Sequence, residues 1–452
     1  MGFKPIFEEE RQFFLNQTGI ELPTECWRNS SKIFLDCTQN KPLIQFKVEN
    51  GKINITKDNR NGFKNKDKIQ SLAEQKKWTT LIAEYSNHLD EMYEEAIQNT
   101  VNFLNSHREY FYLVSFSGGK DSLVLYKVWE EALSRINFEP NWLVNFANTS
   151  NDTADTYKYV KKTIPKDKLN TLNPEIGFYN WLKDVKNYFL PNTRVRNCCS
   201  TYKEGQINKA YNNDRLTVNV IGVRKYESTK RADYEMVMDY EWRKEHFNNS
   251  NVPKAWINFS PIINMKDEEI WLLILKKGWD FNRMYRLGFH RIGCLICPYQ
   301  QDYVDLLIQE YYPKAWERWI TILHKNYDIT CVSQNLKWTF DEWSSGRWKR
   351  ALSKEYYIIG NKPTKERVKE LSELKGISEE MAKKYFQKVC SCGKKCSPTE
   401  IAMFYKTQGR FEGKEDNRTV LCQKCLCELT GWSKNEYKQI ATDYRDSGCQ
   451  LF

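Results

Sequence analysis

The sequence of 452 residues lacks the features that direct a chain into or across a membrane. No segment has a basic start followed by a long apolar run, and no apolar stretch approaches the length that spans a bilayer. Internal repeats and extended low-complexity segments are also missing. We therefore expect a soluble, cytoplasmic protein without membrane contact, and the length of the chain predicts more than one domain.

The fourteen cysteines are not accompanied by an export signal, which argues against a disulfide scaffold and favours metal or thiol chemistry. Cys26, Cys37 and Cys331 are isolated in the sequence, and we expect them to be small buried apolar residues. Most of the others are close together in the sequence: Cys198 with Cys199, Cys294 with Cys297, and Cys390, Cys392, Cys396, Cys422, Cys425 and Cys427.

The composition is basic and rich in aromatic residues. A net charge of +11 is combined with 15 Trp and 26 Tyr. Phosphate contacts and base stacking both use these residue types, so the composition favours a nucleic-acid partner. A basic balance is also common in proteins that bind only small anions.

Residues 115–122, with the sequence SFSGGKDS, are the most informative segment of the chain. They follow an apolar, strand-like run at 110–114 and precede a helix-like segment at 123–129. Two glycines allow a sharp turn and a close approach to a ligand, while backbone N–H groups at the new helix attract an anion. The spacing is not that of a Walker A loop. The candidate phosphate-binding residues are Ser115, Ser117, Gly118, Gly119, Lys120, Asp121 and Ser122.

The order of predicted elements indicates an α/β fold. A second apolar strand at 142–146 follows one helix after the loop, and a third strand is expected at 216–223. This order predicts a parallel sheet flanked by helices, with ligands at the carboxyl ends of the strands. Alternating residues around Asn50-Gly51 predict a small β-rich appendage with a hairpin.

Changes in residue composition along the chain predict four domains. A β-rich domain occupies 1–65, and the α/β domain that carries the phosphate loop occupies 66–312. A helical region rich in Trp, Lys and Arg follows at 313–388, and a cysteine-rich domain at 389–452.

SGGKDS is similar to the PP-loop of the ATP-pyrophosphatase superfamily, and four further segments match one branch of it in chain order. The chain resembles the phosphoadenosine phosphosulfate reductase family between residue 110 and about residue 300. The matching segments lie at 148–157, 196–199, 222–231 and 288–298. The resemblance implies ATP or an adenylyl sulfonucleotide at the loop, with Mg²⁺ on its phosphates.

The segment that ends the third strand adds candidate anion ligands. Arg224 is able to make a bidentate contact to phosphate or sulfate, Arg231 to reinforce it, and Glu227 to hold an arginine in place. An exposed ion-pair network at a helix start is the alternative. With the resemblance, Gly222, Arg224 and Arg231 are expected to bind the nucleotide, and Lys120, Asp121, Arg224 and Glu227 to act in catalysis.

In the adenylylsulfate-reductase-like branch of this family, a Cys-Cys pair and a later CxxC ligate a [4Fe–4S] cluster. The resemblance therefore implies such a cluster on Cys198, Cys199, Cys294 and Cys297. Four thiolates are the soft ligands that this cluster needs. Adjacent cysteines are awkward for tetrahedral zinc, which remains an alternative together with free thiols.

Cys392, Cys396, Cys422 and Cys425 are similar in spacing to a Cys₄ zinc ribbon or treble clef. Cys390 or Cys427 is able to replace one of these ligands, and unligated thiols are the alternative. Structural Zn²⁺ would stabilise a domain with a small core and would present the nearby lysines to a nucleic acid.

Three functions follow from the resemblance. The first is ATP-dependent adenylation and sulfur transfer, similar to the ATP-pyrophosphatase subunit of DNA phosphorothioation systems, with a sulfur donor such as a cysteine desulfurase. The second is a sulfonucleotide reductase that forms sulfite with thioredoxin. That family ends in Glu-Cys-Gly-[Ile/Leu]-His, whereas the residues around Cys449 read DSGCQLF. The third is a non-catalytic protein that senses a nucleotide and binds nucleic acid.

Overall fold

The computed structural model divides the chain into two compact units, and each is described by itself. The first unit contains 1–187 and 197–319, and the second contains 188–196 and 320–452. The described residues are 2–38, 41–60, 77–193, 197–211, 214–228, 231–246, 254–333, 336–350, 358–359, 362–390, 392–407 and 420–446. The division into four domains stays a prediction.

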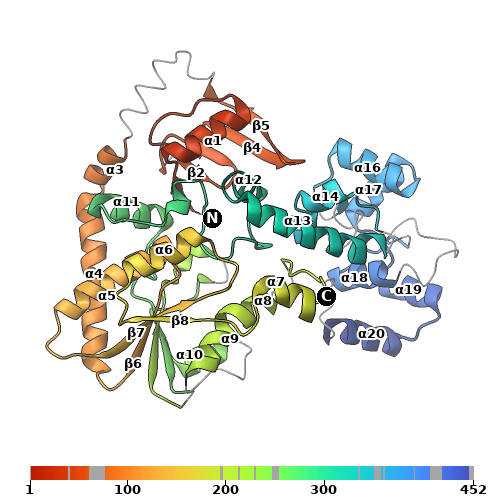
Figure 1. The fold of residues 1–452 in the computed structure, drawn as a ribbon. Coiled ribbons are helices and arrows are strands. Elements are labelled where there is room, and N and C mark those ends of the chain that lie inside the picture. The colour runs from red at the N-terminus through yellow and green to blue at the C-terminus, as the bar shows by residue number, and fades with distance from the viewer. Residues whose placement is uncertain are drawn as a thin grey trace. The chain divides into compact units, whose positions relative to one another are not determined.

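The first unit is built on a six-stranded sheet in the order β10-β11-β9-β6-β7-β8 (Figure 1). All neighbours in it are parallel except β10 and β11. Apolar residues fill its centre, so that Val114 pairs with both Val144 and Val220. The strands are β6 (Phe111–Ser115), β7 (Asn141–Ala147), β8 (Leu169–Leu172), β9 (Thr217–Val220), β10 (Val237–Met238) and β11 (Trp256–Phe259).

Helices flank this sheet and complete one apolar core. Residues of α4 (Ser86–Ser106), α5 (Lys120–Ser134), α6 (Ala154–Thr163) and α11 (Asp267–Lys277) share a buried cluster with β6, β7 and β9. The fold class predicted from the sequence is therefore confirmed. The shorter helical segments of this unit are α3 (Trp78–Glu84), α7 (Phe178–Asn180), η2 (Trp181–Val185), α8 (Asn197–Cys199), η3 (Ser200–Glu204), α9 (Gly205–Ala210), η4 (Lys225–Glu227), α10 (Tyr240–His246), η6 (Arg283–Tyr285) and α12 (Asp302–Tyr311).

The N-terminal residues form a separate antiparallel sheet in the order β1-β2-β3-β4-β5, with helix α1 (Glu8–Thr18). The expected hairpin joins β4 to β5 through Asn50 and Gly51, which both have positive φ. Phe7 packs against Phe281 with ring centroids 5.1 Å apart, so this sheet shares the core of the first unit. The strands are β1 (Lys4–Pro5), β2 (Trp27–Asn29), β3 (Lys32–Phe34), β4 (Ile44–Glu49) and β5 (Lys52–Asp58).

The second unit is largely helical, as its composition predicts, and has a small core of its own. Leu371, Tyr385 and Leu426 are fully buried there, together with several cysteines. No described helix in either unit is long and apolar enough to cross a membrane. Its helical segments are α13 (Pro313–Tyr327), which begins in the first unit, and η7 (Asp328–Val332), α14 (Phe340–Ser344), η8 (Arg347–Lys349), α16 (Lys365–Lys375), α17 (Glu379–Gln387), α18 (Pro398–Thr407), α19 (Gln423–Thr430) and α20 (Lys434–Asp446).

Candidate functional site

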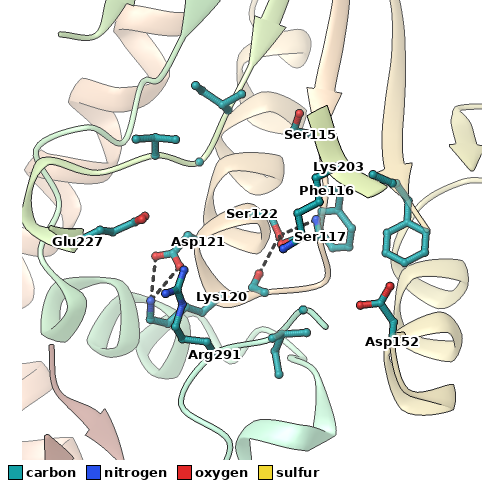
Figure 2. A pocket seen from close by; sticks show the side chains of 18 of the residues that line it. Ser115, Phe116, Ser117, Lys120, Asp121, Ser122, Asp152, Lys203, Glu227 and Arg291 are labelled. Carbon is teal, nitrogen blue, oxygen red and sulfur yellow. Dashed lines mark hydrogen bonds and ion pairs between the residues drawn. The ribbon is translucent and has the colours of Figure 1, made fainter. Parts of the chain in front are cut away.

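A cavity of about 470 Å³ lies at the carboxyl ends of β6, β7 and β9, where the sequence predicts a ligand (Figure 2). Most of the predicted nucleotide-binding residues line it. These are Ser115, Ser117, Gly119, Lys120, Asp121, Ser122, Gly222 and Arg224, whereas Gly118 and Arg231 are not among the lining residues. The predicted catalytic residue Glu227 also lines the cavity.

Glycines allow the turn and the close backbone approach beside this cavity. Gly118 has a φ of 75°, which favours glycine, and it turns the chain from β6 into α5. A Cβ on Gly222 would lie 3.2 Å from the backbone carbonyl atoms of Asp121, so a larger residue would require the segment after β9 and the start of α5 to move apart slightly. The backbone N–H of Lys120 donates to Tyr285 Oη at 2.9 Å, which fixes the first residue of the helix.

Lys120 does not extend into solvent but joins a buried set of ion pairs, which we call the charge cluster: Lys120, Asp121, Arg224 and Asp267. Lys120 Nζ lies 2.9 Å from Asp121 Oδ2 and 2.8 Å from Asp267 Oδ1 (Figure 2 shows the pair with Asp121). Arg224 Nε donates to Asp121 Oδ1 at 2.7 Å, and its Nη2 to Asp267 Oδ1 at 2.5 Å. Lys120 and Arg224 are only 6% and 1% exposed, so both cations are shielded from water.

The electrostatics of the charge cluster favour four ionised groups. Burial by itself would raise the pKa of Asp121 and Asp267, but the charges of Lys120 and Arg224 outweigh burial and lower both pKa values. Two cations and two carboxylates therefore balance. Sequence reasoning missed Asp267, because an acid at the first residue of a helix is common and gives no specific signal.

Other polar side chains face the cavity without having been predicted. Arg291 is exposed, and Lys203 and Asp152 lie on the cavity wall (Figure 2). His290 is buried, which holds the pKa of its imidazole well below the usual range, and its Nδ1 has no hydrogen-bond partner among the described residues. These residues add two cations, one carboxyl group and a neutral ring to the predicted set.

Glu227 forms an ion pair with Arg231, and its Oε1 lies 4.0 Å from Arg224 Nε. Burial and the nearby charge of Arg291 lower the pKa of Arg231. Arg231 and Arg224 therefore both lie close to the Glu227 carboxylate beside the cavity. Their roles in ligand binding stay predictions.

Lys203 connects this cavity with the central cysteines, by which we mean Cys198, Cys199, Cys294 and Cys297. It lies on η3, a π-helical turn directly after Cys199, and π-helical turns are frequent at functional sites. The electrostatic effect of Cys294 makes the largest contribution to the raised pKa of Lys203, ahead of burial, which opposes it. A lysine thus lies within electrostatic reach of both the cavity and the sulfur atoms.

The central cysteines are close to one another but not gathered tightly. A hydrogen bond with Cys199, burial, and the charges of Cys294 and Cys297 raise the pKa of Cys198. Burial raises the pKa of Cys294 to about 11. Among the described residues, these four sulfur atoms do not form a group within 4.8 Å of one another. The iron–sulfur ligand set stays a prediction.

Asn151 holds the loop that carries Cys294 and Cys297. Its carbonyl oxygen accepts a hydrogen bond from Leu295 N at 2.5 Å, and its Nδ2 donates to Ile296 O at 2.8 Å. Asn151 is 4% exposed. The position of the CxxC is therefore set by a residue 145 positions earlier in the chain.

The C-terminal cysteines form a tight group. The sulfur atoms of Cys390, Cys392, Cys422 and Cys425 all lie within 4.8 Å of one another, and we call these residues the cysteine cluster. A metal ion fits such a set of four thiols. The group contains Cys390 in place of the predicted Cys396, a replacement that the sequence left open.

The backbone explains this replacement. Cys390 N donates to Lys394 O, and Cys396 N to Lys388 O, each at 2.8 Å, so that residues 388–390 and 394–396 lie side by side as a hairpin. Cys390 and Cys392 lie near the tip of this hairpin, whereas Cys396 lies at its base with Sγ 4.0 Å from Val420 O. The other two cysteines come from the start of α19, where Cys422 is the N-cap.

Glu400 joins the beginnings of two helices beside the cysteine cluster. Its carboxylate accepts hydrogen bonds from Ser397 N and Gln423 N, each at 2.8 Å. Because Gln423 follows Cys422, this contact helps to position the start of α19. Residue 196, the first of the matching segment 196–199, and Cys449 lie outside the described residues.

Residues 112–300 match the family described as the phosphoadenosine phosphosulfate reductase domain. An uncharacterized protein of Methanocaldococcus jannaschii is 29% identical over 217 residues, which are 47% of this chain and 41% of the relative. A second uncharacterized protein of the same organism is 27% identical over 266 residues, 59% of this chain and 56% of the relative. The chain thus spans about half the length of these relatives.

Two solved structures are similar at a low level. The phosphoadenylyl-sulfate reductase of Candida auris has 16% identity and a TM-score of 0.33, over 46% of this chain and 94% of that chain. The FMN adenylyltransferase of Candida glabrata has 15% identity and a TM-score of 0.33, over 47% of this chain and 64% of that chain.

Proposed function

We propose that this chain, which carries a phosphoadenosine phosphosulfate reductase domain at residues 112–300, binds ATP in the cavity and transfers its adenylyl group to an acceptor. The observation that carries the proposal is a glycine-shaped loop backed by the charge cluster at the carboxyl ends of parallel strands. In the reaction, an acceptor oxygen bonds to the α-phosphorus, the bond from that phosphorus to the β-phosphate oxygen breaks, and pyrophosphate leaves.

The residues around the cavity suit this reaction. The N-terminal N–H groups of α5 and the cations Arg291 and Lys203 would stabilise the negative charge that develops on the leaving pyrophosphate. The charge cluster keeps the loop rigid before the nucleotide arrives, so that little reorganisation is needed. Mg²⁺ usually binds through phosphates and one or two carboxylates, and Asp121, with a side chain 25% exposed, is the loop carboxylate that fits this role.

A nucleic acid is the acceptor class that we propose, with a sulfur nucleophile displacing AMP in a second step. The net charge of +11 and the lysine-rich second unit support this choice. The sulfur would come from a donor protein such as a cysteine desulfurase.

The central cysteines are proposed to hold a [4Fe–4S] cluster. Four thiols suit this cluster, and Lys203 would offset part of its negative charge. Zn²⁺ is proposed for the cysteine cluster, because four sulfur atoms from a hairpin and a helix start are typical of structural zinc sites.

A sulfonucleotide reductase is the second candidate, and Lys203 is the observation that favours it. This lysine lies between the central cysteines and the cavity, where the sulfate group of an adenylyl sulfonucleotide would need a cation. A third candidate is a protein that binds the nucleotide without cleaving it.

Product analysis separates these candidates. Anaerobically purified protein is incubated with Mg²⁺, a single-stranded nucleic acid as acceptor, and either ATP or adenylylsulfate plus thioredoxin, and pyrophosphate, AMP and sulfite are measured. We expect pyrophosphate from ATP and no sulfite. Sulfite from adenylylsulfate without pyrophosphate from ATP would favour the reductase, and binding without any product would favour the sensor.

A matched pair of variants links the reaction to the cavity. Arg291→Ala removes an exposed cation that lines the cavity, and Arg283→Ala removes one whose guanidinium lies 3.9 Å from Asp155 and does not line it. We expect the first variant to lose at least about tenfold in turnover, equal to about 1.4 kcal/mol, and the second to keep it. Equal turnover in both variants would exclude Arg291 from the site.

A further inference from the structure

A second groove, of about 730 Å³, lies on the second unit beside the cysteine cluster. Its walls are the base of the 388–396 hairpin, the first residues of α18 and α19, and one face of α20 (helices labelled in Figure 1). We call it the lysine groove. The residues that give it its chemistry are Lys394, Lys395, Glu400, Tyr437, Lys438 and Thr442.

The charge of the lysine groove is positive. Lys394, Lys395 and Lys438 are exposed, and neither Lys395 nor Lys438 forms an ion pair with another described residue. Glu400 is the one carboxylate among the lining residues that the structure describes. It is 7% exposed and already binds Lys394 Nζ at 2.9 Å and two backbone N–H groups. The groove therefore has cations available for an anion and no free carboxylate to oppose them.

Tyr437 gives a second, independent indication of a ligand. Its side chain is 4% exposed and lines the groove, yet its hydroxyl has no hydrogen-bond partner among the described residues. A buried hydroxyl without a partner is costly, so such groups usually bind something. An acceptor oxygen from a ligand in the groove would satisfy it.

We propose that the lysine groove binds the phosphodiester backbone of a nucleic acid. Phosphate oxygens accept from lysine ammonium groups and hydroxyls, which are the donors that Lys395, Lys438 and Tyr437 supply. The ring of Tyr437 is too buried to stack on a base, so the contact reads phosphates and not sequence. The proposal rests on the nucleic-acid acceptor of the proposed function and names the surface that holds it.

Binding of a labelled 20-nucleotide single strand to the zinc-loaded full chain, measured by anisotropy without ATP between 50 and 200 mM salt, tests this proposal. We expect Lys395→Glu with Lys438→Glu to weaken binding at least about tenfold at 100 mM salt. The slope of log affinity against log salt should fall in magnitude by about 1.4, since two phosphate contacts are lost. Lys395→Arg with Lys438→Arg should bind normally.

Two further variants give the test its specificity. Lys362→Glu with Lys365→Glu reverses the same charge on exposed lysines outside the groove, and should weaken binding less than threefold. Tyr437→Phe keeps the ring and removes the hydroxyl, and should weaken binding about threefold to tenfold. Equal losses in the two lysine pairs, or unchanged binding in both groove variants, would overturn the proposal.

Competitors distinguish the class of ligand. A 20-nucleotide strand should compete far better than inorganic phosphate or polyglutamate. Equal competition by phosphate would reduce the groove to a small-anion site, and equal competition by polyglutamate would indicate an acidic protein partner, so each result contradicts the proposal.

Pyrophosphate release from ATP, measured on the same preparations, separates the proposal for the lysine groove from the proposed reaction. Release with no strand binding refutes the groove alone, and strand binding with no release refutes the proposed reaction alone.

Discussion

The charge cluster and the cysteine cluster differ in what balances the charges of their side chains. Lys120 and Arg224 neutralise Asp121 and Asp267, so each buried charge at the phosphate loop already has a partner in the protein. At the cysteine cluster, four sulfur atoms face one another, and Cys392 Sγ lies 3.7 Å from Cys422 Sγ. Thiolates at this distance repel one another unless a cation joins them.

The two sites therefore differ in whether a ligand is needed to form them. The nucleotide cavity is shaped by the protein's own ion pairs and packing, and a nucleotide would enter a prepared site. The cysteine cluster belongs to a small core, and a metal ion bound there would contribute to folding itself. The predictions below test this contrast, in order of decreasing effect.

Removal of metal should have the largest effect. Treatment with a chelator, or Cys422→Ser, should abolish protection from amide exchange across α18 and α19, because structural zinc contributes about 10–16 kcal/mol to folding in small domains. Cys427→Ser, outside the cysteine cluster, should change little. Unchanged protection of α19 in the chelated protein would mean that no metal supports this unit.

Loss of one carboxylate from the charge cluster should have the second-largest effect. Asp267→Asn leaves Lys120 and Arg224 buried with a single carboxylate, and breaking a buried pair costs about 3–5 kcal/mol. The control Glu94→Gln breaks an exposed pair with Arg135, which is worth about 0–1 kcal/mol. Urea unfolding, followed by tryptophan fluorescence, measures the free energy of unfolding of both variants. Similar losses of this free energy would show that the charge cluster is not effectively buried.

Glu400→Ala should weaken zinc binding without preventing it. Contacts that orient metal ligands typically contribute tenfold to a hundredfold in affinity, and Glu400 holds the start of α19 through Gln423 N. Glu428→Ala, on the exposed face of the same helix, is the matched control. Competition with a chromophoric chelator gives the zinc affinity. Equal zinc affinities for both variants would show that Glu400 does not help to position the zinc ligands.

Acid should lower the stability of the first unit, because the Asp121 carboxylate becomes protonated. The folded pKa of Asp121 lies below its ordinary value of 3.8, because Lys120 and Arg224 outweigh the effect of burial. Its contribution to stability is therefore present above pH 3.8 and is lost as the pH falls through the lowered pKa. The free energy of unfolding should fall with a slope of up to about 1.4 kcal/mol per pH unit from this group, and Asp121→Asn should lack that part of the slope. Parallel curves for the two proteins would contradict the lowered pKa.

Much of the first unit could be predicted from local signals. The apolar run before SGGKDS and the return to apolar residues at 142–146 identify β6 and β7, and Asn50-Gly51 identifies the β4–β5 hairpin. These elements depend on neighbouring residues, which the sequence displays directly.

The rest depends on contacts between distant residues. Asp267 meets Lys120 only because α11 packs beside α5, and Lys203 meets Cys294 only through the fold. The choice of Cys390 over Cys396 depends on how a hairpin of nine residues turns, which spacing alone leaves open.

Amide hydrogen exchange with and without ligands tests most directly whether the cavity is a prepared nucleotide site. With saturating ATP and Mg²⁺, exchange should slow by at least about tenfold at the start of α5 and in residues 222–224, which line the cavity from two sides. Zinc added to the metal-free protein should instead slow exchange in the 388–396 hairpin and at the start of α19. If saturating ATP leaves exchange at the start of α5 unchanged, the cavity is not a nucleotide site and the account is wrong.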